Sequence, residues 1–127
     1  MEPLSEEQTT KLIAIVMDLA REGSTDELLE FLDHGMPVDV QDADGNTALM
    51  LAAYHGRTGT VRALVERGAD VDRRNNRDQS PIAGALFKGE DEIVAALRDA
   101  GADLDAGTPS ARATAEMFGR TALLDRD

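Results

Sequence analysis

The chain of 127 residues contains no cysteine and no tryptophan. Without cysteine it can form no disulfide, no thiolate nucleophile and no cysteine-ligated zinc site. Only 3% of its residues are aromatic, although 42% are hydrophobic. The core is therefore expected to consist of leucine, valine, isoleucine and alanine packed between closely spaced helices.

Basic charge is also scarce. Lysine and arginine number 13 against 25 aspartate and glutamate residues, so the formal net charge is −12 at pH 7. Generic binding to nucleic acid or to an anionic membrane requires a basic face. We therefore expect neither a nucleic acid nor a membrane as partner.

Long apolar runs are missing as well. The longest one, residues 12–17, is far too short to span a bilayer. Residues 1–7 contain no basic segment that leads into an apolar run, so they do not resemble a secretory signal. A cytoplasmic protein is expected, and a secreted chain whose signal has been removed stays open.

Strand-like alternation and flexible linkers are absent too, and a 33-residue repeat is the main pattern. Gly23, Gly56 and Gly89 are 33 residues apart, and a second glycine series lies 12 residues further on. A fixed period of this length is typical of stacked repeats. The sequence predicts a single all-α domain, residues 1–127, of about four helix–turn–helix units. Their approximate bounds are 5–41, 42–74, 75–107 and 108–127.

The first unit contains clear helix boundaries. Ser5 and Gln8 have the spacing of a capping box, and Gly23 is placed to end the first helix in a left-handed conformation. Ser24 or Thr25 is expected to cap the second helix. The predicted apolar faces are Leu12, Ile13, Val16, Leu19 and Ala20 on the first helix, and Leu28, Leu29, Phe31 and Leu32 on the second.

The later units repeat this plan. The predicted core positions are Leu49, Ala52, Ala53, Val61, Leu64 and Val65 in the second unit, and Ile82, Ala85, Leu86, Ile93, Val94 and Leu97 in the third. Pro81 fits a first helical turn. In the fourth unit Pro109 is expected to open a helix that carries Ala113, Met117 and Phe118 inward, before a short helix with Leu123 and Leu124. Single apolar residues, Val38, Val71 and Leu104, are expected to hold the long loops against the stack.

These residues resemble the ankyrin repeat family, and in particular its short, stand-alone bacterial members. The second unit carries the family pattern at Asp42, Gly45, Thr47, Leu49, Ala52, Ala53, Gly56, Val61, Leu64, Val65 and residues 68–72. The third unit carries it at residues 80–82, Ala85, Gly89, Ile93, Val94, Leu97 and residues 101–103. The resemblance implies a solenoid with atypical terminal caps that works as a non-catalytic binding scaffold.

One departure concerns the family's Thr-Pro-Leu-His element. It reads Thr-Ala-Leu-Met at residues 47–50 and Ser-Pro-Ile-Ala at residues 80–83, so the histidine that commonly links neighbouring turns is absent. We therefore expect hydrophobic stacking, rather than a hydrogen-bond network between turns, to dominate the contacts between units.

The resemblance also implies a concave protein-binding face formed by the loops and the first helices. Its exposed positions in this sequence are Asp44, Asn46, Tyr54, His55, Arg74, Arg77, Gln79, Phe87 and Lys88. Tyr54 and Phe87 are 33 residues apart and are expected to lie side by side as an aromatic contact site. The alternative is that Phe87 only packs on its neighbours.

Arg73, Arg74 and Arg77 form a local basic spot. They can meet carboxylates on a partner, or they can pair with the nearby acids at positions 70, 72 and 78. Both interpretations stay open at this stage.

Catalytic and metal motifs are weak. His34 and His55 lie near predicted helix C-termini, where the helix dipole favours a cation, and neither has a motif partner. Residues 39–45 resemble a calcium loop, but Val40 and Leu51 occupy positions that need acids. We expect no catalytic residue, no metal and no cofactor.

The predicted function is protein–protein interaction by a non-catalytic scaffold, a monomer rather than an oligomer. An inhibitor or immunity-type protein that blocks a partner enzyme is the first alternative. An enzyme with a hidden carboxylate pair and a structural stack without a partner are the others.

Overall fold

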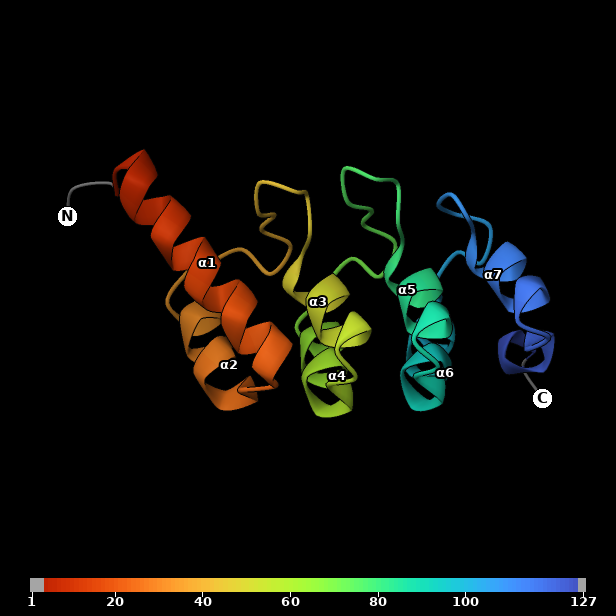
Figure 1. The fold of residues 1–127 in the computed structure, drawn as a ribbon. Helices are drawn as coiled ribbons and strands as arrows, with labels where there is room; N and C mark the ends of the chain where they lie inside the picture. The colour runs from red at the N-terminus through yellow and green to blue at the C-terminus, as the bar shows by residue number, and fades with distance from the viewer. Residues whose placement is uncertain (1–3, 126–127) are drawn as a thin grey trace.

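The computed structural model describes residues 4–125, which form four helix pairs standing side by side in a row (Figure 1). The helices are α1 (Glu6–Glu22), α2 (Thr25–Asp33), α3 (Ala48–Tyr54), α4 (Thr58–Glu66), α5 (Pro81–Phe87), α6 (Asp91–Asp99) and α7 (Ala111–Met117), followed by the 3₁₀ helix η1 (Thr121–Leu124). No strand occurs within this described range. The predicted all-α repeat architecture is confirmed.

The helices form two layers. In one layer α1, α3, α5 and α7 pack in succession, and in the other α2, α4, α6 and η1 do the same. Long loops connect the pairs and extend from one side of the row as fingers (Figure 1). Most of these helices have only seven to nine residues, and isolated helices shorter than about 12–15 residues are marginal in water. Stacking between neighbours is therefore what stabilises them.

Each first helix begins at a hydroxyl side chain. Ser5, Thr47, Ser80 and Ser110 accept a hydrogen bond from the backbone N–H three residues further on. The capping box at Ser5 is confirmed, because the Gln8 side chain also accepts from the Ser5 N–H at 2.9 Å. Caps of this kind are worth about 1 kcal/mol each.

The second helices use a different device. Their start follows a left-handed glycine, at positions 23, 56, 89 and 119, with φ between 67° and 78°. The next residue in each case donates its N–H to a carbonyl five residues back, at 2.7–2.9 Å. Ser24 occupies the N-cap position of α2, as expected, but its side chain makes no capping hydrogen bond. The Thr25 hydroxyl meets that of Thr60 on α4, with 2.6 Å between the oxygens.

The core runs the length of the stack between the two layers. Its fully enclosed members include Ala52, Ala53 and Ala85, whose small side chains let neighbouring first helices approach closely. The predicted face of α2 needs correction, since only Leu28 is buried there and the other three apolar residues are half-buried. The second helix of a terminal pair has a neighbour on one side only, which accounts for this exposure.

The loops are held by apolar and polar contacts together. Val38, Val71 and Leu104 pack against the core as predicted. Successive fingers are also hydrogen-bonded to each other, through Asn76 to the carbonyls of Ala43 (3.0 Å) and Asp44 (2.9 Å). Hydrophobic stacking is therefore accompanied by a network between the turns, built from asparagine and aspartate rather than from histidine.

The last unit differs from its prediction. Pro109 lies in the preceding turn, and α7 begins at Ala111 after the Ser110 cap. Ala111, Thr114 and Ala115 face the core, whereas Ala113, Met117 and Phe118 are exposed. Because the cap is at Ser110, the inward face of the helix is shifted relative to the predicted one. The final helix carrying Leu123 and Leu124 is present as η1.

Candidate functional site: a groove along the first helices

Two adjoining cavities lie along the first-helix layer, and we call them together the first-helix groove. One measures about 370 Å³ and the other about 290 Å³, and both are lined by Met50, Tyr54 and Gln79. The larger cavity is also lined by Ala83, Gly84, Phe87, Pro109, Thr114, Met117 and Phe118. The smaller is also lined by Asp44, Asn46, Leu51, His55, Asn75 and Arg77. The groove thus has an apolar end and a polar end that meet at Tyr54.

Aromatic side chains dominate the apolar end. Phe87 is 60% exposed and packs edge-to-face on Phe118, with ring centroids 5.9 Å apart. Met117 is 69% exposed and lines the same cavity. Tyr54 and Phe87 line this cavity together, but the ring that packs on Phe87 is that of Phe118 from the next unit.

Met117 was predicted to lie in the core, but in the last unit it occupies the position that Tyr54 and Phe87 occupy in the central units. It lies seven residues after the Ser110 cap, as Tyr54 does after Thr47 and Phe87 does after Ser80. Counting from the cap, rather than from the 33-residue period, would have found it. The period fails here because the loop before α7 is three residues shorter.

Tyr54 stands at the centre of the groove and is 37% exposed. The Lys88 ammonium lies 5.0 Å from its ring centroid, within the range of a cation–π interaction. The His55 ring meets the Tyr54 ring edge-on at 5.6 Å. Tyr54 therefore presents its ring at the boundary between the apolar cavity and a group of cationic side chains.

The polar end is built by two fingers. Asn75 donates to the side chains of Asn46 (2.9 Å) and Gln79 (2.7 Å), which fixes these three residues relative to one another. Asp44 is exposed at the rim, and its carbonyl accepts the N–H of Asn76. All these groups lie on loops that the stacked helices hold in place, an arrangement suited to recognition.

The three clustered arginines separate into two kinds. Arg73 lies 3.7 Å from Asp70, and Arg74 lies 3.0 Å from Asp78, so both pair within their own loop. Arg77 lines the groove and has no carboxylate within ion-pair distance in the part of the chain that the structure describes. Pairing with nearby acids is thus confirmed for Arg73 and Arg74, and contact with a partner's carboxylate stays a prediction for Arg77.

The surroundings of His55 lower its pKa. Partial burial lowers its pKa below the ordinary value of 6.5, and the charges of nearby cations lower it further. These cations are Arg21, Arg57 and Lys88. The expectation that a helix C-terminus would favour a cation here was wrong, because desolvation and these positive charges oppose protonation.

We expect a proton NMR titration to show a His55 midpoint below 6.5. Substituting Lys88→Gln should raise this midpoint, whereas Lys11→Gln should leave it unchanged, because Lys11 pairs with Glu7 on α1. Because folding lowers the pKa of His55, the folded state disfavours the protonated ring. The contribution of neutral His55 to the free energy of unfolding is therefore full above pH 6.5, and it is lost as the pH falls through the lowered pKa. A midpoint above 6.5 would contradict this electrostatic environment.

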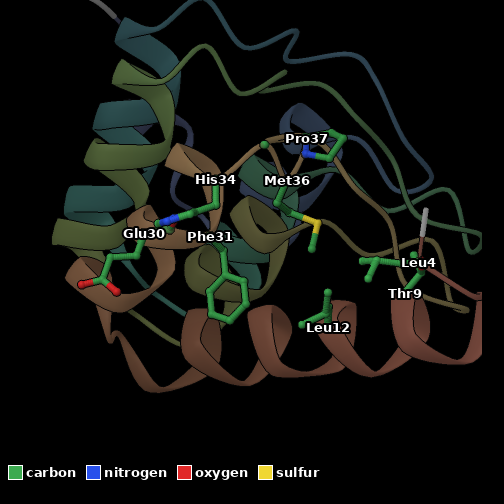
Figure 2. Close-up of a pocket in the computed structure, with 9 residues that line it drawn as sticks. Leu4, Thr9, Leu12, Glu30, Phe31, His34, Met36 and Pro37 are labelled. Carbon is green, nitrogen blue, oxygen red and sulfur yellow. The ribbon is translucent and has the colours of Figure 1, made fainter. Parts of the chain in front are cut away.

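Another cavity, of about 500 Å³, lies at the other end of the stack (Figure 2). Leu12 of α1, Phe31 of α2 and Met36 of the following loop form its apolar walls. His34 lies at its edge, where its Nδ1 is 2.7 Å from the Glu30 carbonyl oxygen. Sequence reasoning did not anticipate this cavity. It lies where α1, with 17 residues, extends beyond its shorter partner α2, with nine (Figure 1).

Two arrangements considered from the sequence, a hidden carboxylate pair and a metal-binding cluster, can be checked in the described residues. Within residues 4–125 the buried polar side chains are all hydroxyls, namely Thr47, Thr60, Ser80 and Thr114, so this range holds no buried carboxylate pair. The same range holds no cluster of three or more residues of the types His, Cys, Asp and Glu that could bind a metal ion. None of its helices has the length and apolar character needed to cross a membrane.

Comparisons with known proteins agree with this repeat geometry. The family model for ankyrin repeats, in three copies, matches residues 16–108. The putative ankyrin repeat protein PA3287 of Pseudomonas aeruginosa is 38% identical over 53 residues. That match covers 42% of this chain and 31% of the relative, so the chain spans less than a third of that protein's length. The family match begins within α1 and ends in the loop before α7, so it covers most of the chain, and the chain therefore belongs to the ankyrin repeat family.

Proposed function

We propose that this chain is a non-catalytic scaffold that binds another protein through the first-helix groove. The observation that carries this proposal is the distribution of exposed apolar side chains. Of the six large ones in the described range, Tyr54, Phe87, Met117 and Phe118 line the groove, and only Leu4 and Ile15 lie elsewhere. Contiguous exposed apolar surface with a polar rim is typical of an interaction site.

The family supports the general part of this proposal, since ankyrin repeats are generally protein-interaction modules. The groove supports the specific part. Its aromatic side chains stand on helices that are fixed by stacking, so little conformational entropy is lost when a partner binds. Buried aromatic anchors surrounded by polar groups account for most of the affinity in many interfaces.

The groove is tested with the double variant Tyr54→Ala, Phe87→Ala as bait in affinity capture from the native organism. We expect a partner that is captured by the wild-type chain to bind this variant at least about 30-fold more weakly, since two interface hot spots are lost. The melting temperature should barely change, because both side chains are exposed.

Ile15→Ala is the matched control. Ile15 is 46% exposed on α1 and lines neither cavity of the groove, so its loss should leave capture intact. Capture that survives the double variant would contradict the proposed interface. Where the captured partner is an enzyme, its activity with and without this chain distinguishes an adaptor from an inhibitor.

A further inference from the structure

Two cations without a carboxylate partner lie at the first-helix groove. Most lysines and arginines of the described range pair with an acid within 4 Å. The exceptions there are Arg57, Arg62, Arg77 and Lys88, although the chain has 25 acidic residues. Arg77 lines the smaller cavity of the groove. Lys88 lines neither cavity, but its ammonium lies 5.0 Å from the ring centroid of Tyr54, which lines both. Arg57 and Arg62 line neither cavity, so two of the four unpaired cations of the described range lie at the groove of a chain whose net charge is −12.

Both signs of charge occur beside this place. The Glu90 carboxylate lies close to Gly56, where an added Cβ would be 2.8 Å from its Oε1, but three cations, Arg21, Arg57 and Lys88, act on the neighbouring His55. Arg57 follows His55 by two residues and is held by a hydrogen bond from its Nε to the Arg21 carbonyl (2.8 Å). The charges of Arg57 and Lys88 both lower the pKa of His55, after the larger effect of its burial. The carboxylate that lines the groove is that of Asp44, which lines the same smaller cavity as Arg77 but lies beyond ion-pair distance of it.

We infer that the partner segment is a peptide that combines bulky apolar side chains with aspartate or glutamate. Its apolar side chains would enter the cavity between Tyr54, Phe87 and Phe118, and its carboxylates would pair with Arg77 and Lys88. This inference rests on the proposed function, and adds to it the chemistry of the partner. Charge complementarity of this kind contributes specificity and association rate more than affinity.

Aromatic rings beside cations also suit single-stranded nucleic acid, whose bases stack and whose phosphates pair with positive charge. The net charge of −12 opposes this occupant, because a polyphosphate chain would be repelled by the acidic surface beyond the groove. A peptide needs only two or three carboxylates, which can be confined to the cationic part of the groove. The peptide is therefore the occupant that the charges favour.

The test uses a library of short random peptides displayed on phage and selected on the full chain. We expect enriched peptides to contain tryptophan, phenylalanine or leucine together with aspartate or glutamate. Their binding should be lost with Tyr54→Ala, Phe87→Ala. It should weaken about fivefold with Arg77→Gln and about fivefold with Lys88→Gln, as for partly exposed ion pairs. Lys11→Gln and Arg62→Gln, which remove equal charge outside the groove, should leave affinity unchanged.

The outcomes separate the two levels of the proposal. Two results would overturn the inference and leave the groove as the binding site. In the first, the selected peptides need Tyr54 and Phe87 but contain no excess of acidic residues. In the second, they bind the Arg77→Gln and Lys88→Gln variants with the same affinity as the wild-type chain. Tighter binding of a single-stranded oligonucleotide to the same groove would overturn it as well. If no selected peptide depends on Tyr54 and Phe87, both the inference and the proposed interface are wrong.

Discussion

Truncating Leu49 to alanine is expected to lower the free energy of unfolding by about 2–5 kcal/mol. Leu49 is 1% exposed and lies on α3, which packs against α1 on one side and α5 on the other. The smaller side chain leaves a cavity that both neighbours border. Because stability in a stack of repeats is the sum of unit and interface contributions, the damage reaches two interfaces rather than one.

Urea unfolding followed by circular dichroism provides the measurement. Glu66→Ala is the control, since Glu66 is exposed at the end of α4 and surface changes usually stay within about 0.5 kcal/mol. If Leu49→Ala and Glu66→Ala lowered the free energy of unfolding equally, Leu49 would not lie at the interface between units.

The substitution Gly45→Ala is expected to cost about 2–4 kcal/mol, from left-handed strain and from broken hydrogen bonds between fingers. Gly45 has φ +79°, and an added Cβ would lie 2.5 Å from the Asn76 Oδ1 and 2.7 Å from its backbone nitrogen. Such distances force Asn76 to move. Its N–H and side-chain amide donate to the carbonyls of Asp44 and Ala43, so both bonds between the fingers would be weakened.

Gly68→Ala separates these two contributions. Gly68 has φ +86° but nothing within 4 Å of an added Cβ, so only the conformational strain of about 1–2 kcal/mol applies. The free energies of unfolding of the two variants, measured by heat and by urea, should therefore differ by the cost of the clash with Asn76. If both substitutions lower the free energy of unfolding by similar amounts, the contact between the fingers contributes nothing to stability.

Features that depend only on residues close together in the sequence could be predicted from the sequence. The hairpin turns were predictable at Gly23, Gly56 and Gly89, because a left-handed residue is required there whatever the helices pack against. The Ser5 capping box was predictable for the same reason, since both partners lie within one turn. Most of the core positions predicted for the two central units are buried, because helical periodicity reports the face that a helix must hide. Val65 is only half-buried, and the burial of Met50, Leu51 and Ala83 was not predicted.

Predictions failed where the chain departs from its own period. The loop before α7 is three residues shorter, which moved Met117 from an expected core position to the groove. On α2 the apolar face was correctly placed, but its burial was overestimated because a terminal helix has a neighbour on one side only. Periodicity says which face is apolar, and only the packed neighbours decide how completely that face is covered.

The candidate site was partly predictable in the same sense. Tyr54 and Phe87 were placed on one surface by their spacing, and both line one cavity. The packing of Phe87 on Phe118 and the position of Lys88 over Tyr54 were not predictable. Each of these contacts joins residues about 30 positions apart, so it depends on the distance and angle between neighbouring units.

By itself, the sequence determined the repeat class, the hairpin turns and most of the core positions of the two central units, because these depend on local conformation and helical period. The tertiary structure alone decided which cations stay without a carboxylate, which rings meet in the groove and how asparagines join the fingers. Those features depend on side chains from different units, which come within bonding distance only when the helix pairs have stacked.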